Sequence, residues 1–392
     1  MLTQQTALGV DSADSKHIDF TLIAALLLLI FTGLVMASSA SLDISNNLFS
    51  NPFRILLKQG MFVCAGLGII GVMLLVPIAT IERYSWSLLF LAFALLILVL
   101  VVGREVNGSV RWIPLGIFNL QASEAAKLCI VIYLAAYLVR RLDEVRNQWS
   151  GFLKPMAVLG LSAALLLLEP DFGSLVVLMG ASLGMIFMAG ARVLPFILLI
   201  ICMCALIVLL IVVEPYRMAR LASYMDPWAH AFDSGYQLTQ SLIAFGRGEL
   251  LGEGLGNSIQ KLFYLPEAHT DFVYAVLAEE FGVIGSLGIL SLLIFVAWRS
   301  LQIGFRAERL GLLFHGFVAY GISLLFISQA LINIGVNTGL LPTKGLALPL
   351  ISYGGSSLLI NCLAFGIIIR VDYERRLEKA RQKYKKEKDG AT

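Results

Sequence analysis

Charged side chains are scarce in this sequence. Only 14% of its 392 residues are Asp, Glu, Lys or Arg, while 58% are hydrophobic. Soluble domains carry about 25% charged and about 45–50% apolar residues. No soluble fold could bury so much apolar surface, so the composition excludes an ordinary soluble protein and predicts a membrane protein.

Metal-ligand and nucleotide-binding signatures are also missing. The four histidines are scattered, and the five cysteines lie inside apolar runs without the spacing of a metal site or a disulfide framework. There is no Walker loop, and Gly252, Gly254 and Gly256 do not complete the dinucleotide-binding spacing. These absences argue against a zinc site made of histidines and against a cytoplasmic nucleotide as energy source or substrate. The small net charge of +3 gives no indication of a nucleic-acid partner.

A regular series of long apolar runs dominates the chain. A helix needs about 17–25 apolar residues to cross a membrane. Such spans are predicted at about 20–39, 59–76, 85–102, 120–139, 155–168, 172–189, 194–213, 271–298, 312–334 and 348–369. The predicted fold class is therefore all-α, a polytopic transmembrane helical bundle with about ten spans. An even number of spans puts both termini on one side.

The distribution of positive charge predicts that this side is cytoplasmic. With that orientation 19 of the 29 Lys and Arg residues lie on the inner side, nine of them between Arg370 and Lys388. We expect a single transmembrane domain at 20–370, between a cytoplasmic leader at 1–19 and a basic cytoplasmic tail at 371–392.

One connection is much longer than the others. It covers residues from about 214 to 270 and lies on the outer side in this topology. Its segment 236–245 has the apolar spacing of a helix, which predicts a helix lying in the membrane interface. Long loops of this kind usually carry function.

Ionisable residues at the edges of apolar runs are the first functional candidates, because each is unfavourable in a membrane unless it is paired or functional. Glu124 and Lys127 are three residues apart on one helix face, which suits either a structural ion pair or a substrate contact. Asp271 opens the eighth run, where an aspartate can cap the helix or act as a catalytic base in a dehydrated cavity. Spacing alone leaves both alternatives open.

Positive residues form a second group of candidates, on the predicted outer side. Lys344 stands just before the last run, where it is either a solvated cation or a point charge for a diphosphate. Arg217, Arg220, Arg247 and Lys261 would add a positive rim whose field attracts an anionic substrate.

Taken as strings, these residues resemble the SEDS family (shape, elongation, division and sporulation) of integral membrane peptidoglycan polymerases. The resemblance runs from about residue 19 to 380, and its strings are RWI at 111–113, QASEAAK at 121–127, EPDFG at 169–173, GYQ at 235–237, LPEAHTDF at 265–272, PTKG at 342–345 and PLISYGGSS at 349–357. The strings AFGRG at 244–248, GNSIQK at 256–261 and RVDYE at 370–374 are similar to the cell-division branch. One departure is Ala122, where the family commonly has proline.

The resemblance implies a glycosyltransferase that joins lipid II, a disaccharide pentapeptide on undecaprenyl diphosphate, into glycan strands during cell division. It implies that Asp271 is the essential carboxylate, acting as the general base for the acceptor hydroxyl. We expect the Glu124 and Lys127 pair to orient Asp271 or tune its pKa. The expected substrate contacts, including cations for the departing diphosphate, are Lys344, Arg217, Arg220, Glu267, His269, Arg111 and Ser356.

The resemblance also implies a location and partners. The expected location is the bacterial inner membrane, with the long loop in the periplasm, at the division septum. A class B penicillin-binding protein and other divisome membrane proteins are the expected partners. No cofactor is identified, although carboxylates and a diphosphate could recruit Mg²⁺ or Mn²⁺ without a recognisable ligand motif.

Two other classes of function fit the sequence. A lipid II flippase would suit the intramembrane charges, but no clear inverted repeat or pair of broken helices is seen. A scaffold that activates the penicillin-binding protein would make the charged cluster incidental. The sequence favours the polymerase because the charged residues gather at one face of the membrane.

Overall fold

The fold is that of a computed structural model, which describes residues 18–106, 109–114, 116, 119–191, 197, 201, 224–342 and 345–389. In the first half the helices are α1 (Phe20–Phe49), α2 (Arg54–Met73), α3 (Ile78–Arg83), α4 (Ser85–Val102), α5 (Ala122–Arg140), α6 (Leu142–Asn147), α7 (Trp149–Leu168) and α8 (Phe172–Met188). In the second half they are α11 (Tyr236–Gly248), α12 (Val273–Arg309), α13 (Leu313–Asn337) and α14 (Gly355–Asp389). The strands β1 (Arg104–Val106), β2 (Ser109–Pro114) and β3 (Asn119–Gln121) form one antiparallel sheet in that order.

Long apolar helices confirm the predicted class of fold. Within the described residues, eight helices are long and apolar enough to cross a membrane, namely α1, α2, α4, α5, α7, α12, α13 and α14. Helix α8 is a shorter apolar helix that packs on α5 and α13. The chain is therefore a multi-pass membrane protein with an all-α bundle. The predicted span at 194–213 lies outside the described residues.

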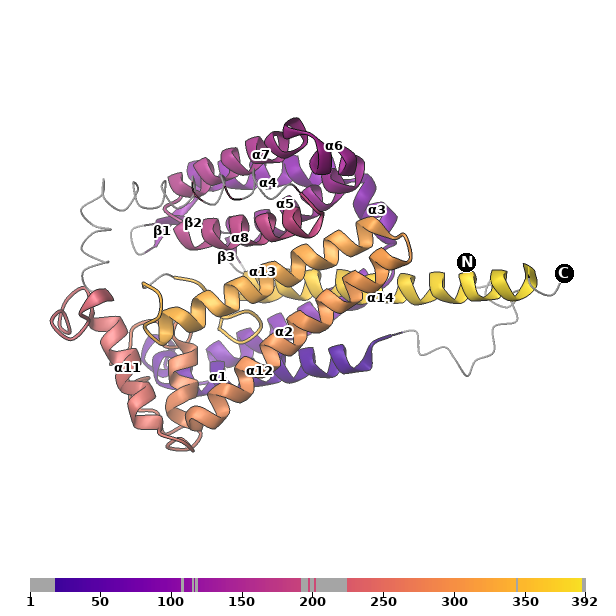
Figure 1. The fold of residues 1–392 in the computed structure, drawn as a ribbon. Helices are drawn as coiled ribbons and strands as arrows, with labels where there is room; N and C mark the ends of the chain where they lie inside the picture. The colour runs from indigo at the N-terminus through magenta and orange to yellow at the C-terminus, as the bar shows by residue number, and fades with distance from the viewer. Residues whose placement is uncertain are drawn as a thin grey trace.

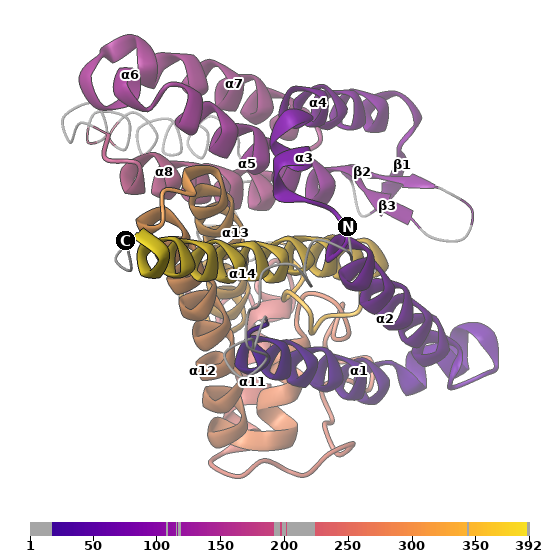
Figure 2. The same ribbon diagram turned by 90° about the vertical axis from the view of Figure 1, so that its right-hand side faces the viewer.

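The bundle has two sides and a central layer. Helices α3 to α8 form one side, α1, α2, α11 and α12 form the other, and α13 and α14 lie between them (Figures 1 and 2). Helix α5 is buried over almost its whole length, so it belongs to the core. In helices α2 and α4 most residues are exposed or only partly buried, as a surface against lipid chains requires.

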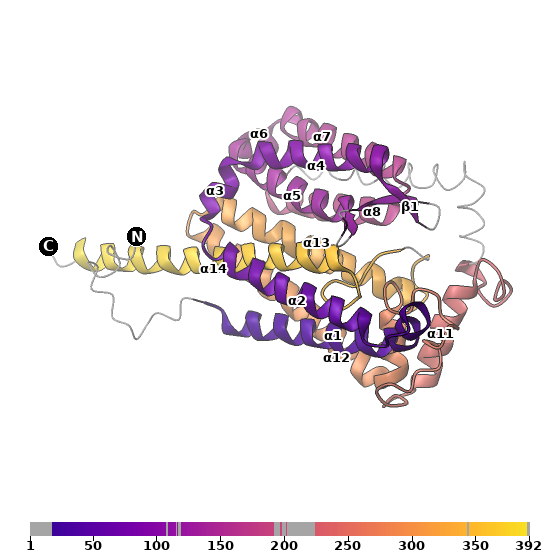
Figure 3. The same cartoon turned by 180° about the vertical axis from the view of Figure 1, so that it is seen from behind.

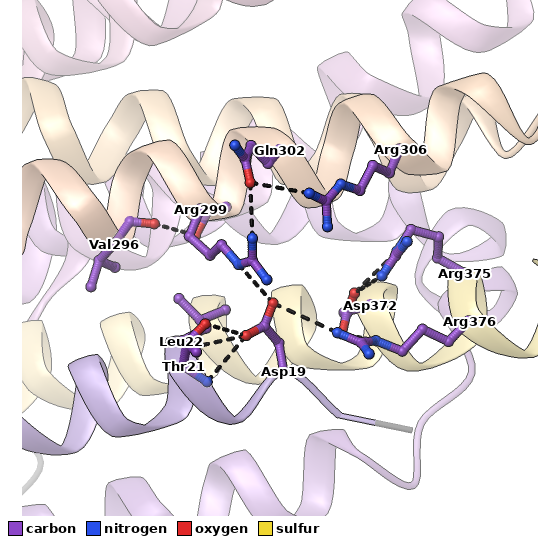
Figure 4. Close-up of polar contacts among 11 residues, drawn as sticks. Asp19, Thr21, Leu22, Val296, Arg299, Gln302, Arg306, Asp372, Arg375 and Arg376 are labelled. Carbon is purple, nitrogen blue, oxygen red and sulfur yellow. Dashed lines mark hydrogen bonds and ion pairs between the residues drawn. The ribbon is translucent and has the colours of Figure 1, made fainter. Parts of the chain in front are cut away.

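The two ends of the bundle differ. The small sheet and α11 lie at one end, while α14 continues beyond the opposite end (Figures 1 and 3). At that opposite end Asp19, the N-cap residue of α1, accepts a hydrogen bond of 2.8 Å from Arg299 Nε and lies 3.7 Å from Arg376 of α14 (Figure 4). The start of α1 and the end of α14 therefore lie on the same side, as the predicted topology requires.

Two features of the fold were not predicted. Residues 104–121 contain the small antiparallel sheet rather than a plain loop. Helix α12 is interrupted at Gly282, whose backbone is left-handed with φ of 66°. The break frees the carbonyl groups of Glu279 and Glu280, and they accept hydrogen bonds of 2.9 and 3.0 Å from the backbone at Glu253 and Gly254. The first part of α12 is thus a separate short helix held by the long loop.

The contacts of Asp19 give a stability prediction. Asp19 and Arg299 are 5% and 20% exposed, and hydrogen bonds to charged groups in such places contribute about 1.5–3 kcal/mol. We expect Asp19→Asn and Arg299→Gln each to lower the free energy of unfolding by about that amount, and the double variant to lose less than the sum of the two. Thermal unfolding in detergent measures this.

Arg381→Gln is the matched control, because Arg381 lies 3.9 Å from Glu378 with 70% of its side chain exposed. Pairs as exposed as this one contribute about 0–1 kcal/mol. Additive losses for Asp19 and Arg299, or losses no larger than that of the control, would contradict the prediction.

Candidate active site

Asp271 lies in a tight turn that precedes α12. The turn is closed by the carbonyl of Glu267, which accepts hydrogen bonds from the backbone N–H groups of Thr270 and Phe272 at 3.1 and 3.2 Å. Glu267 has φ of 56°, a left-handed conformation that is costly for a residue with a side chain. Helix α12 begins at Val273 with Phe272 in the N-cap position, so the interpretation of Asp271 as a helix cap is wrong.

The Asp271 carboxylate has no recorded hydrogen-bond partner among the described residues, and it borders the narrow space between Gly345 and Arg111, called the gap below. Among the described residues no side chain or backbone group is recorded as donating a hydrogen bond to it, and its exposure is intermediate. A Cβ atom placed on Gly345 would lie 3.1 Å from Asp271 Oδ2 and 3.7 Å from Arg111 Nη1. These two charged groups therefore approach each other across Gly345, yet no ion pair between described residues joins them. The space suits an incoming group.

The surroundings of Asp271 raise its pKa to about 7. Burial is the largest cause, because it disfavours the charged form, and the negative charges of Glu267 and Asp171 act in the same direction. The positive charge of Arg111 works against them. A carboxyl group with this pKa is half ionised near neutral pH and is a much stronger base than an ordinary aspartate.

Arg111 stands on β2 and brings positive charge to the gap. Its Nη2 donates a hydrogen bond to the carbonyl of Pro170, and its Nε is buried without a hydrogen-bond partner among the described residues. Of the Arg111 atoms, Nη1 lies nearest to the Cβ position of Gly345, at 3.7 Å. A guanidinium held in this way keeps donors available for an anionic ligand.

The connection between α7 and α8 adds two buried carboxyl groups. Asp171 is saturated: its side chain accepts hydrogen bonds of 2.8 Å from the hydroxyls of Ser123 and Ser174 and one of 3.2 Å from the Ser174 N–H. Glu169 is 0% exposed, and neither of its carboxyl oxygens has a hydrogen-bond partner among the described residues. Burial and then the charge of Asp171 raise the pKa of Glu169 to about 8, against the opposing charge of Arg111.

The remaining predicted contacts differ in their surroundings. The ring of His269 lies 5.6 Å from that of Tyr353, and burial lowers the pKa of His269, so this histidine is neutral at pH 7 and supplies no positive charge. Ser356 is buried, and its hydroxyl donates to the Asn119 carbonyl at 2.9 Å and accepts from the Gln121 N–H at 3.2 Å. These bonds join α14 to β3. Ser356 as a substrate contact stays a prediction.

Three of the predicted cations, Lys344, Arg217 and Arg220, lie outside the described residues. Within the described part, the expectation that Lys261 belongs to an exposed positive rim is wrong. Its side chain is 6% exposed and pairs at 2.8 Å with the buried carboxylate of Glu280 in α12. Arg247 pairs with Glu279 at 2.9 Å.

Glu124 and Lys127 form the predicted ion pair. Lys127 Nζ lies 2.8 Å from Glu124 Oε1, and both side chains are buried. Lys127 also donates a hydrogen bond to Gln329 Oε1 of α13, at 2.7 Å. The expectation that the pair orients Asp271 stays a prediction. No contact between the pair and Asp271 is recorded.

Sequence reasoning missed the buried carboxyl of Glu169, the close approach at Gly345 and three amide side chains of α13. The amides are Gln329, Asn333 and Asn337. Their spacing of four residues in an apolar helix is a signal that could have found them. Nothing in a single sequence could have found the approach at Gly345.

In the described residues no three His, Cys, Asp or Glu side chains are grouped so that they could hold a metal ion.

Known proteins are similar to this chain in sequence and in fold. The family model for FtsW, RodA and SpoVE, described as cell cycle protein, matches residues 20–377. The "Probable peptidoglycan glycosyltransferase FtsW" of Pseudomonas fluorescens is 52% identical over 95% of this chain and 90% of its own length. The protein with the same description from Coxiella burnetii is 51% identical over 93% of this chain and 98% of its own length.

Two solved structures are similar over almost their whole length. A chain from a study described as "Structural coordination of polymerization and crosslinking by a peptidoglycan synthase complex" has a TM-score of 0.76 and 28% identity, covering 91% of this chain and 98% of that one. The rod shape determining protein RodA of Thermus thermophilus has a TM-score of 0.67 and 25% identity, covering 91% of this chain and 97% of that one.

The raised pKa of Glu169 predicts a pH-dependent stability. In the folded state this group holds its proton up to about pH 8, but in the unfolded state only up to the ordinary glutamate pKa of 4.5. The folded state therefore binds more protons between these values, and the free energy of unfolding falls as pH rises through that window. We expect Glu169→Gln to remove this loss, so that the variant gains thermal stability over the original chain at pH 8.5 but not at pH 5.

A suitable control is Glu387→Gln, which removes a carboxylate that is 65% exposed on α14. A stability difference between Glu169→Gln and the original chain that does not change with pH, or that changes as it does for the control, would argue against the buried proton.

Proposed function

The chain belongs to the FtsW, RodA and SpoVE family of cell cycle proteins and is a peptidoglycan glycosyltransferase, in which we propose that Asp271 is the general base. The observation that carries this role is the Asp271 carboxylate, which has a raised pKa, faces Arg111 across Gly345 and has no recorded partner among the described residues. A base needs a free lone pair near the proton that it removes and a pKa close to the working pH. Asp271 meets both conditions.

The substrate that we propose is lipid II, a disaccharide pentapeptide carried on undecaprenyl diphosphate. The acceptor hydroxyl gives its proton to Asp271 while its oxygen forms a bond with the anomeric carbon of the donor sugar. The bond from that carbon to the diphosphate breaks, and the electron pair leaves with the diphosphate. Negative charge therefore grows on the diphosphate, where cationic donors stabilise it most.

Arg111 is our first candidate for this stabilisation, because one guanidinium nitrogen lies at the gap and another is unpartnered. Lys344, Arg217 and Arg220 are further candidates that rest on the sequence alone. The carboxyls near Asp271 are not grouped as a ligand set for a resident metal. We therefore propose that a divalent cation, where one is used, binds with the diphosphate, and we assign it no step.

The proposed partners are a class B penicillin-binding protein and other divisome membrane proteins, in the inner membrane at the septum. Support comes from the 51–52% identity to proteins described as FtsW and from the similarity to a chain of a peptidoglycan synthase complex. In that setting the end that carries Asp271 faces the periplasm and the end that carries Asp19 faces the cytoplasm.

Removing the base is the first test. We expect Asp271→Asn to lower the rate of glycan polymerisation from lipid II by about 10²–10⁴-fold, because a general base contributes that much. The rate of the original chain should rise with pH around a midpoint near 7, since the base must be ionised. The protein, purified with its transpeptidase, is assayed by gel separation of the strands.

Equal polymerisation by both proteins would overturn the role of Asp271. If neither forms strands but lipid II crosses the bilayer of reconstituted vesicles, the flippase alternative takes its place. If neither activity is found while the transpeptidase is stimulated, the scaffold alternative does.

Filling the gap is the second test. In Gly345→Ala the new methyl group would lie 3.1 Å from Asp271 Oδ2, which displaces the carboxylate or the sugar hydroxyl beside it. A displacement of about 1 Å can reduce the rate about 10²-fold. We expect a fall of at least about tenfold in the polymerisation rate with unchanged thermal stability.

Gly354→Ala is the control from the same segment, since its Cβ would meet only Ser357 Cβ at 3.8 Å, an ordinary contact. If Gly345→Ala polymerises as well as Gly354→Ala, the space beside Asp271 is not where the reaction takes place.

A further inference from the structure

Three amide side chains of α13 lie on one face of the helix. Gln329, Asn333 and Asn337 are four residues apart, and all are at most 4% exposed. A buried amide is unfavourable unless its donors and acceptor are hydrogen-bonded. The hydrogen-bond partners of these amides therefore show which segments this face of α13 stabilises.

The partners of two of them lie at the proposed base. Asn333 Nδ2 and Asn337 Nδ2 both donate to the backbone carbonyl of Asp271, at 2.8 and 3.0 Å. Asn337 Oδ1 accepts the N–H of Ala275, in the first turn of α12, at 3.1 Å. Two amides thus hold the backbone at Asp271 and just after it, without touching the carboxylate.

The same face of α13 also holds the opposite wall of the gap. Asn333 Nδ2 donates to the carbonyl of Leu346 at 2.5 Å, and Gln329 Nε2 donates to that of Ala347 at 3.1 Å. These residues follow Gly345, which lies beside the carboxylate. A further bond of 2.5 Å, from Ser352 Oγ to the Thr270 carbonyl, joins the two walls directly.

Gln329 connects this arrangement to the core. Its Oε1 accepts from Lys127 Nζ at 2.7 Å, and Lys127 pairs with Glu124. The ion pair of α5 therefore fixes the orientation of the Gln329 amide, which leaves Nε2 directed at Ala347. Through Gln329, the pair reaches the segment next to Asp271 rather than Asp271 itself.

We propose that Asn333 and Asn337 are positioning residues of the reaction, which hold the Asp271 carboxylate at a fixed distance from the wall at Gly345. Asn333 does so by binding the backbone of Asp271 and Leu346, and Asn337 by binding that of Asp271 and Ala275. This inference rests on the proposed role of Asp271. Its physical basis is preorganisation: a base held in place before the substrate arrives needs no reorganisation in the transition state. Such residues should affect the catalytic step more than the binding of substrate.

The test replaces each amide by leucine, which has nearly the same shape but no hydrogen-bonding groups. For Asn333→Leu and Asn337→Leu we expect kcat for lipid II polymerisation to fall by about 10–100-fold, with KM changed by less than about threefold. We also expect the pH midpoint of kcat to move below that of the original chain, because a loosened turn admits water to Asp271 and lowers its pKa. Thermal unfolding of each variant shows whether it is folded.

Asn361→Leu is the matched control. Asn361 also lies in a membrane helix, α14, but its amide donates only within that helix, to the backbone carbonyl of Ser357 at 2.8 Å and the hydroxyl of the same residue. Asn333→Gln is a second variant, which keeps an amide donor and should recover part of the lost kcat in Asn333→Leu.

The outcomes separate the two proposals. Normal kcat and pH midpoint in Asn333→Leu and Asn337→Leu, with an inactive Asp271→Asn, would overturn the positioning role alone. An active Asp271→Asn would overturn the role of the base itself. A fall in kcat equal to that of Asn361→Leu, or without a shift of the pH midpoint, would mean that the amides stabilise the fold only.

Discussion

Irregular backbone inside a helical membrane bundle must find its hydrogen bonds within the protein, and this constraint shapes the whole site. The segments 249–272, 338–342 and 345–354 are such backbone. Glu279 accepts the N–H groups of Ile259 and Gln260, at 3.1 and 3.2 Å, together with the Ser258 hydroxyl. The broken helix α12 and the amides of α13 supply the other partners. The described parts of these segments are therefore held by hydrogen bonds although they are not helical, and irregular backbone held in this way can place a side chain where no helix could.

The backbone and the side chain of Asp271 differ in their hydrogen bonding. Its carbonyl accepts two amide donors, whereas its carboxylate has no recorded partner among the described residues. A helix cap or an ion pair would have lowered the pKa and weakened the base. Of the four carboxylates between Glu267 and Glu280, the other three accept hydrogen bonds from protein side chains. The distribution of partners leaves Asp271 free to act on a substrate.

The sequence was sufficient for features that depend on local pattern. Runs of apolar residues predicted the spans, the carboxylate that opens the eighth span was identified, and the Glu124 and Lys127 pair followed from a spacing of three. Features that depend on distant contacts were missed or mistaken. Lys261 looked like a surface cation because its partner Glu280 lies 19 residues further along the chain, just before a helix break at Gly282 that no local pattern indicates. The wall at Gly345 depends on a fold that brings residues 111, 271 and 345 together.

An anionic substrate must enter a site that contains several carboxyl groups, and the pattern of protonation resolves this conflict. Glu169 holds its proton up to about pH 8, and Asp271 is only half ionised near neutral pH. The charge near Arg111 is therefore less negative than the residue count suggests. A diphosphate that binds beside Arg111 would raise both pKa values further, since it adds negative charge. In the proposed reaction the Arg111 guanidinium would offset that charge, and it would thereby act both on the ionisation of Asp271 and on the departure of the diphosphate.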